Sequence, residues 1–279
     1  MIIQPNMTDR TFELINHFQP QPIHIPINKC ELEEVIEALV ELMFPICDSP
    51  FSRDVRGGLL QAAKKLHANI AHLTDKATAD EKTEAFFDKF IQLQERLFED
   101  ADCYLRFDPA AKSLEEVIIT YPGFYALCVH RLAHELHLLD LPLFARLFSE
   151  YGHSKVGIDI HPAAKVGKNL FMDHGTGIVI GETAEIGDNV KIYQGVTLGA
   201  LYVEKKLSDM KRHPTVEDNV VIYANATILG GTTVIGHDST IGGGSWLTRS
   251  VIPYSVVTNP VEVKIRPGKD FSGPYDFVI

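Results

Sequence analysis

The sequence lacks the usual features of secreted, membrane-spanning and nucleic-acid-binding proteins. Only four of its 279 residues are cysteines, and they are scattered: Cys30, Cys47, Cys103 and Cys128. This predicts free thiols in a reducing compartment. No apolar run could span a bilayer, and the opening stretch MIIQPNMTDR lacks the basic and apolar segments of a secretory signal. The net charge of −11 makes nucleic acid and anionic membranes poor partners. We therefore expect a cytoplasmic protein.

The N-terminal half also lacks the strand–helix alternation and the Gly-rich loop of a nucleotide-binding domain. Residues 1–27 are rich in Gln and Pro, which predicts an irregular arm, whereas residues 28–152 have apolar side chains at helical spacing. Three pairs fit a capping box at a helix start: Asn28 with Glu31, Thr78 with Glu81, and Ser113 with Glu116. We therefore predict an α-helical domain over residues 28–152.

Three histidines in this half share one helix face: His130, His134 and His137. Such spacing is compatible with a metal site, but no nearby Cys or carboxylate completes a ligand set convincingly. A polar or packed helix face is the interpretation we favour, and we expect no metal.

The C-terminal half has a fixed repeat. Aliphatic residues recur at steps of six: Ile160, Val166 and Met172, then Ile180, Ile186, Ile192 and Leu198, later Val216, Ile222 and Ile228, and, after a one-residue slip, Ile235, Ile241 and Leu247. This period is typical of a parallel β-helix, in which each short strand buries one aliphatic residue before the chain turns. We predict a β-helix over residues 153–265 and a tail over residues 266–279. The flat faces of such a prism favour oligomers.

Two irregularities of the repeat carry polar side chains. One step is eight residues long and contains Asp173 and His174, and a long charged loop ends in Arg212 and His213. Loops held on a rigid scaffold commonly carry chemistry. Asp159 and His174 fit a carboxylate and a catalytic base, but they also fit ordinary turn positions, and spacing alone does not decide between these interpretations.

Five stretches of the chain resemble the serine O-acetyltransferases. They are DPAAKSLEEVIITYPGFYAL from Asp108, DIHPAAKVG from Asp159, DHGTGIVIGETAEIG from Asp173, VTLG from Val196 and KRHP from Lys211. The resemblance covers roughly residues 100–265 and implies an α+β protein, with an N-terminal α-helical domain followed by a left-handed parallel β-helix of hexapeptide repeats. It also implies an acetyl-CoA-dependent transferase that acetylates the L-serine hydroxyl in cysteine biosynthesis.

The chain departs from the family pattern in two places. Ala200 stands where a second Gly is usual, and the loop before Arg212 is longer and more charged. The first hundred residues match only loosely. The resemblance therefore implies a homotrimer through the β-helix more firmly than a dimer of trimers through the helices.

The resemblance also assigns the reacting groups. It implies that His174 is the general base that takes the serine hydroxyl proton and that Asp159 orients its imidazole. Asp108 and Asp173 match the carboxylates that face the serine ammonium. The alternative for Asp108 is a helix cap before Pro109.

Further matching residues bind the rest of the two substrates. Arg212 and His213 match the groups that hold the serine carboxylate, although a solvated loop charge is the alternative for Arg212. Acetyl-CoA, the co-substrate, is expected near four small residues: Gly199, Ala200, Ala224 and Gly243. A backbone N–H near Gly199 and Ala200 would stabilise the thioester oxygen. No cofactor or metal is implied.

The C-terminal tail and the site predict two further partners. In many serine acetyltransferases a terminal Ile enters the active site of O-acetylserine sulfhydrylase, and this chain ends in Ile279. The alternative is that the tail packs on its own β-helix. L-cysteine shares the ammonium and carboxylate of serine and is expected to be a feedback inhibitor.

Other functions are compatible with a hexapeptide repeat. One is an acyltransferase acting on homoserine or a sugar amine. Another is a zinc enzyme of the γ-carbonic anhydrase type, with His161, His174 and His213 as available ligands. A third is a scaffold without catalysis, in which His174 would have no role.

Overall fold

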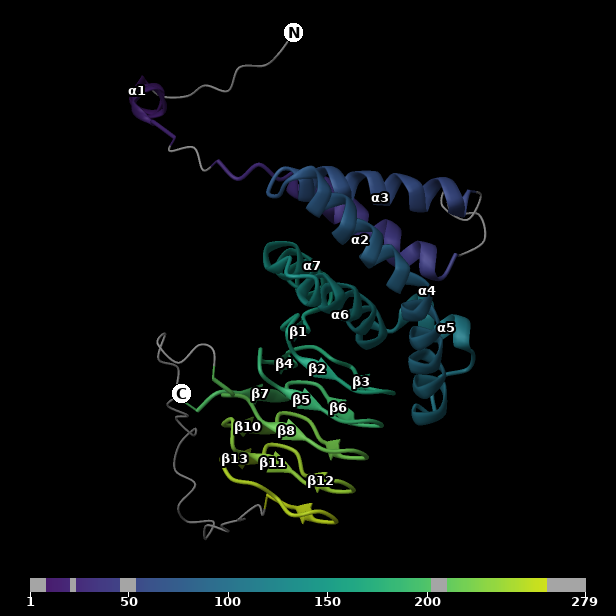
Figure 1. Ribbon diagram of the computed structural model, residues 1–279. Coiled ribbons are helices and arrows are strands. Elements are labelled where there is room, and N and C mark those ends of the chain that lie inside the picture. The colour runs from purple at the N-terminus through teal and green to yellow at the C-terminus, as the bar shows by residue number, and fades with distance from the viewer. Residues whose placement is uncertain (1–8, 21–23, 46–53, 202–209, 260–279) are drawn as a thin grey trace.

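The computed structural model describes residues 9–20, 24–45, 54–201 and 210–259. Figure 1 shows helices above a stack of short strands, with α6 and α7 lying directly on the first strands. The helices are α1 (Asp9–His17), α2 (Lys29–Met43), α3 (Val55–Ala71), α4 (Lys76–Phe107), α5 (Leu114–Thr120), α6 (Pro122–Leu138) and α7 (Pro142–Val156). None is long and apolar enough to cross a membrane, as far as the described residues extend. Cys30, Cys103 and Cys128 are free thiols, and Cys47 lies outside the described residues.

The helix starts test the predicted caps. The Asn28 side chain accepts from the Glu31 N–H at 3.2 Å, and the Ser113 hydroxyl accepts from Glu116 N–H at 3.1 Å, so these two caps are confirmed. The Thr78 cap is wrong. Helix α4 begins one turn earlier because the Asp75 carboxylate accepts the Thr78 N–H at 3.0 Å. Helix α1 forms within the arm that we expected to be irregular.

The strands form three parallel sheets, one on each side of a prism. The first contains β1 (Asp159–Ile160), β4 (Val179–Ile180), β7 (Thr197–Gly199), β10 (Thr227–Leu229) and β13 (Trp246–Leu247). The second contains β2 (Lys165–Val166), β5 (Glu185–Ile186), β8 (Thr215–Val216) and β11 (Val234–Ile235). The third contains β3 (Phe171–Asp173), β6 (Lys191–Tyr193), β9 (Val221–Ile222), β12 (Thr240–Ile241) and β14 (Val256–Val257). We call them sheets A, B and C, and a coil visits A, B and C in turn.

The predicted six-residue positions form the core of this β-helix. Ile160, Ile180, Leu198 and Ile228 stack in sheet A and are almost fully buried. In the last coils, hydroxyl side chains stand next to this core in place of aliphatic ones. Ser245, for example, is buried and donates to Gly242 O at 2.7 Å.

The eight-residue step is a two-residue insertion at the corner between sheets C and A. Asp173 pairs with Tyr193 across the coils, and the Gly195 N–H donates to Thr176 O, which aligns Gly195 with Gly177. Three residues therefore separate Asp173 from Gly177, where only one separates Tyr193 from Gly195. The insertion lets the backbone project at His174.

The helical domain is fixed to the first coil by buried polar contacts. Arg131 of α6 donates to Gly167 O at 3.0 Å, and Asp100 of α4 accepts the Asn169 N–H at 2.9 Å. Leu127 of α6 is buried in the same apolar cluster as the aliphatic column of the β-helix. The helices therefore cover the N-terminal end of the prism.

Candidate active site

The predicted site residues gather at two corners of the prism, one at each edge of sheet A. We call the corner between sheets C and A the aspartate corner, with Asp108, Tyr121, Asp173, His174 and Tyr193. We call the corner between sheets A and B the arginine corner, with His161, Glu182, Thr183, Arg212 and His213.

His174 projects from the aspartate corner. Its side chain is 70% exposed, and its Nδ1 lies 3.6 Å from Asp173 Oδ1. Its φ of 56° is in the left-handed region, which among non-Gly residues here is otherwise occupied mostly by Asn and Asp. Strained backbone of this kind is common at functional sites. The imidazole is thus accessible to a substrate, with one carboxylate beside it.

Asp108 joins this corner from the end of helix α4. Its Oδ2 accepts from the Tyr121 hydroxyl at 2.5 Å, and its Oδ1 accepts the Ala110 N–H at 2.8 Å. Tyr193 pairs with Asp173 in register on the next coil, and burial and the charge of Asp173 raise the pKa of its phenol. Within the described part of the chain, His174 is the only basic side chain in an ion pair with either carboxylate. The two carboxylates therefore suit a positively charged ligand group.

Asp159 begins strand β1 in sheet A and is partly buried. It pairs in register with Val179, close to the corner that carries His174. Between the residues that the structure describes, no hydrogen bond joins Asp159 to His174. The role of Asp159 in orienting the imidazole stays a prediction.

The arginine corner is held together by charge and by one threonine. Arg212 donates to the Glu182 carboxylate, and the Thr183 hydroxyl accepts the Arg212 and His213 N–H groups at 2.9 and 3.0 Å. Burial raises the pKa of Glu182, but Arg212 and His161 outweigh it, so the pKa is lowered overall. Glu182 therefore remains ionised and holds the guanidinium in place.

The contacts of His213 keep its imidazole neutral, with one ring N–H available to donate. Its Nδ1 accepts the Thr183 N–H at 3.0 Å, which puts the ring hydrogen on Nε2. Burial, and then the positive charge of Arg212, lowers its pKa to about 4. A Cβ at Gly181 would lie 2.0 Å from the imidazole, so only Gly leaves room for this ring. Nε2 can thus donate to a carboxylate at neutral pH.

The four small residues predicted to meet acetyl-CoA divide between the corners. Ala224 and Gly243 lie one above the other on later coils of the aspartate corner, since Ala224 O accepts the Gly244 N–H at 2.9 Å. Gly199 ends strand β7 and Ala200 follows it, at the other edge of sheet A. Ala224 and Gly243 extend the corner of His174 along the prism axis.

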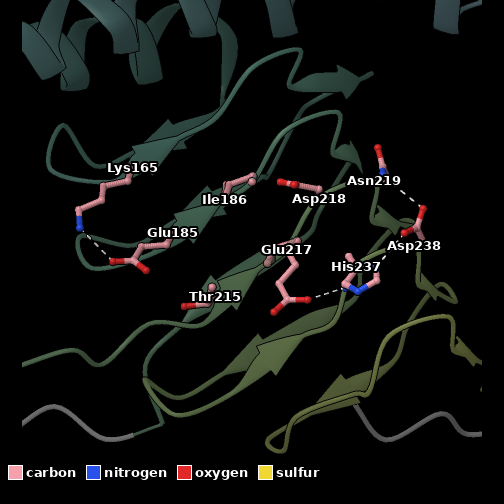
Figure 2. A pocket seen from close by; sticks show the side chains of 11 residues that line it. Lys165, Glu185, Ile186, Thr215, Glu217, Asp218, Asn219, His237 and Asp238 are labelled. Carbon is pink, nitrogen blue, oxygen red and sulfur yellow. Dashed lines mark hydrogen bonds and ion pairs between the residues drawn. The ribbon is translucent and has the colours of Figure 1, made fainter.

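A hollow of about 540 Å³ lies elsewhere, on sheet B. Figure 2 shows residues that line it, among them Lys165, Glu185, Glu217, His237 and Asp238. Its charged groups satisfy one another: Lys165 pairs with Glu185 at 3.1 Å, and Glu217 accepts the His237 N–H at 2.8 Å. None of the predicted site residues lines it, and we do not assign it to catalysis.

Sequence reasoning missed Tyr121, Glu182 and Thr183. All three lie inside stretches that carry the family resemblance, YPGFYAL and GIVIGET, and that was the available signal. No three His, Cys, Asp or Glu side chains in the described ranges come together in a way that could hold a metal. His161 and His213 share the arginine corner, whereas His174 is at the other.

No protein-family model matches the chain. The plasmid serine acetyltransferase of Synechococcus elongatus is 51% identical over 200 residues, which cover 70% of this chain and 61% of that protein. The chain thus spans less than two thirds of that relative. Serine acetyltransferase of Bacillus subtilis is 46% identical over 174 residues, covering 62% of this chain and 78% of that protein.

Solved structures agree with these relatives. Serine acetyltransferase isoform 3 of Entamoeba histolytica, in complex with cysteine, superposes with a TM-score of 0.76 at 31% identity, over 92% of this chain and 93% of that one. The Neisseria gonorrhoeae serine acetyltransferase in complex with serine gives 0.58 at 28% identity, over 88% and 98%. From its sequence relatives, its β-helix and its two corners, the chain belongs to the serine acetyltransferase family.

Proposed function

We propose that the protein transfers the acetyl group of acetyl-CoA to the hydroxyl of L-serine, giving O-acetyl-L-serine and CoA. The observation that carries this proposal is the placement of His174. It projects from a two-residue insertion, is accessible, and stands beside the carboxylate of Asp173. Family membership supplies the reaction class, and these side chains supply chemistry that fits an amino-acid acceptor.

His174 acts as the general base in this mechanism. A primary alcohol is a weak nucleophile at neutral pH, so its proton must leave as the bond to the thioester carbon forms. The imidazole takes that proton while the serine oxygen attacks. The tetrahedral intermediate then expels the CoA sulfur, which receives the proton from the imidazolium. Asp159 is proposed to orient the ring and stabilise its charged form.

The two corners fit the two charged ends of serine. Asp108 and Asp173 suit the ammonium, and Arg212 with the Nε2–H of His213 suits the carboxylate. Both groups are bonded to one carbon, yet the corners lie at opposite edges of sheet A. From Gly177 to Gly181 is four residues, or roughly 13 Å at about 3.3 Å per residue.

A single chain therefore cannot place both corners on one serine molecule. A homotrimer would do so if the aspartate corner of one subunit met the arginine corner of the next. Sheet A, which joins the two corners, has apolar side chains facing outward, with Val179 37% and Trp246 69% exposed. An exposed apolar face supports subunit contact there. A dimer of trimers through the helices remains part of the proposal.

Acetyl-CoA is proposed to lie along the aspartate corner, past Ala224 and Gly243, with its thioester next to His174. Small residues permit close approach of the pantetheine arm. Backbone near Gly199 and Ala200, brought in by the neighbouring subunit, would stabilise the oxyanion. The mechanism requires no metal and no prosthetic group.

L-cysteine is the proposed inhibitor, because it offers the same ammonium and carboxylate to the two corners. We also propose a cytoplasmic location and a complex with O-acetylserine sulfhydrylase through the terminal Ile279. That residue lies outside the described part of the chain, so this partner rests on the sequence.

The direct test is thiol release from acetyl-CoA with different acceptors. L-serine should react at least tenfold faster than L-homoserine and glucosamine at equal concentration, which is about 1.4 kcal/mol in the barrier. Faster reaction with homoserine or with the sugar amine would assign the protein to another acyltransferase activity. No thiol release with any of these acceptors would contradict the proposal and leave the zinc enzyme and the scaffold as interpretations.

A further inference from the structure

A second polar cavity lies at the junction of the helices with the β-helix, and none of the predicted site residues lines it. It has a volume of about 280 Å³ and is enclosed by α4, α6 and strand β2. A buried water needs only roughly 10–15 Å³, so the cavity can hold something larger. Its polar lining consists of Lys89, Gln92, Arg96, His130, Arg131 and Glu135, with His134 beside them.

The lining is cationic in a protein that is acidic overall. Lys89, Arg96 and Arg131 provide three positive charges, and Glu135 provides one negative charge. Behind this lining, the carboxylates of Asp100, Asp188 and Glu99 also act on Arg96. The lining alone therefore carries an excess of two positive charges, in a chain with a net charge of −11.

The Asp100 carboxylate, behind this lining, already accepts hydrogen bonds from the protein. Asp100 accepts from Arg131 Nε at 2.7 Å and from the Asn169 N–H at 2.9 Å. It approaches Arg96 Nε only to 3.9 Å, which is beyond hydrogen-bond distance. Burial and the nearby Arg131 lower the pKa of Arg96 by more than Asp100, Asp188 and Glu99 raise it.

Two buried nitrogens on side chains of this lining lack partners within the described structure. They are Arg96 Nε and His130 Nδ1. His130 is only 3% exposed, and burial, with the charges of its neighbours, lowers the pKa of its imidazole well below the usual value. Leaving a buried polar nitrogen without a hydrogen-bond partner destabilises the folded protein, so such groups normally have a reason to be present.

We propose that this cavity binds a small tetrahedral oxyanion of the sulfate or phosphate class. The anion would meet Lys89 and Arg96 from inside the cavity and would neutralise the excess positive charge of the wall. Gln92 and His130 supply uncharged groups that can donate hydrogen bonds. The site would be separate from the proposed serine and acetyl-CoA sites.

Occupancy of this site should strengthen the junction between the two parts of the protein. Arg131, on the cavity wall, also donates to Gly167 O in the first coil. An anion that fixes the charged wall would hold this contact in place. The expected readout is thermal stability, which does not depend on catalysis.

The test is a titration of the full-length protein with sodium sulfate and, separately, potassium phosphate, with sodium chloride holding ionic strength constant. Calorimetry should show saturable binding, and the melting temperature should rise along the same curve. Because sulfate also stabilises proteins non-specifically, the variants decide the interpretation. Arg96→Gln should weaken binding at least about tenfold, the equivalent of one charge-assisted hydrogen bond.

Arg106→Gln is the matched control, because Arg106 lies on the same helix, is exposed and pairs with Asp102 at 2.9 Å. It should bind the anions as the unaltered protein does. If Arg96→Gln fails to fold, Lys89→Gln replaces it, since Lys89 is exposed. The proposal is overturned if the unaltered protein shows no saturable binding, or if the cavity variants bind as tightly as Arg106→Gln.

Discussion

The Tyr121 hydroxyl donates to Asp108 Oδ2 at 2.5 Å, and the Tyr121 ring packs edge-on against Tyr104 with ring centroids 6.0 Å apart. The ring contact fixes the phenol, and the phenol fixes the carboxylate. Burial, and then the Asp108 carboxylate, raises the pKa of Tyr121, so it stays protonated and remains a donor. Asp108 is thereby held toward Asp173 before any substrate arrives.

Replacing Tyr121 with Phe should therefore weaken serine binding. A hydrogen bond to a charged group contributes about 1.5–3 kcal/mol, so KM for serine should rise roughly tenfold or more, with little change in KM for acetyl-CoA. Steady-state kinetics with each substrate varied would measure this. Tyr125→Phe, one helical turn away, should leave both constants unchanged. Equal rises in both KM values would show a general distortion instead.

Replacing His174 with Ala should lower kcat by two to four orders of magnitude, which is about the contribution of a general base. The side chain is exposed, so the melting temperature should not change. Near-normal turnover in a correctly assembled variant would exclude His174 as the base.

Asp159→Asn separates orientation from binding. If Asp159 orients the imidazole, kcat should fall while both KM values stay near those of the unaltered enzyme. A rise confined to KM for serine would make Asp159 a substrate-binding residue. The pH profile of kcat provides a second measurement, since loss of the carboxylate should move the acidic limb of the profile to lower pH.

Stability should depend on pH through His213. Its pKa in the folded protein is about 4, below the usual value of about 6.5, so the unfolded chain binds the proton more readily. The contribution of neutral His213 to the free energy of unfolding is therefore complete above about pH 6.5 and is lost as the pH falls toward 4. The loss should be on the order of 2–3 kcal/mol, measured by urea unfolding at several pH values. His213→Asn should flatten this part of the curve, and an unchanged curve would contradict the assignment.

Deleting Ile279 should abolish binding to O-acetylserine sulfhydrylase and leave acetyl transfer intact. The physical reason is that one apolar side chain and its carboxylate would anchor the tail in the partner's cleft. Calorimetry with the purified sulfhydrylase measures the first effect and thiol release the second. Unchanged binding after the deletion would show that the tail is not the contact.

The repeat could be predicted because every coil buries the same kind of residue at the same spacing. Ladder bonds show where the period departs from three steps of six, or 18 residues. Lys168 donates to Asp188 across 20 residues, Asp188 to Asp218 across 30, and Asn219 to Asp238 across 19. The first separation exceeds 18 by two residues, which is the eight-residue step that the sequence predicts. The third exceeds 18 by one residue, which is the predicted slip.

The contacts inside each corner could not be read from spacing. Tyr121 meets Asp108 across 13 residues only because helix α5 turns the chain back, and Glu182 meets Arg212 across 30 because an inserted loop returns to the same corner. The Thr78 cap failed for a local reason, since Asp75 accepts the N–H of Thr78 and starts the helix three residues earlier. Such competition between neighbours is decided by backbone geometry rather than by residue type.

Helices cover only one end of the prism, so the β-helix should begin to unfold from its other end. Each coil contacts only its neighbours, so local opening starts at the end with the weaker cap. The first coil is fixed by Arg131 and Asp100, whereas the last coils have buried hydroxyls such as Ser245 next to their core. Hydrogen exchange should therefore speed up toward the last coils. Ala224 and Gly243 lie on later coils than His174, so heating should loosen the proposed acetyl-CoA path before the surroundings of His174.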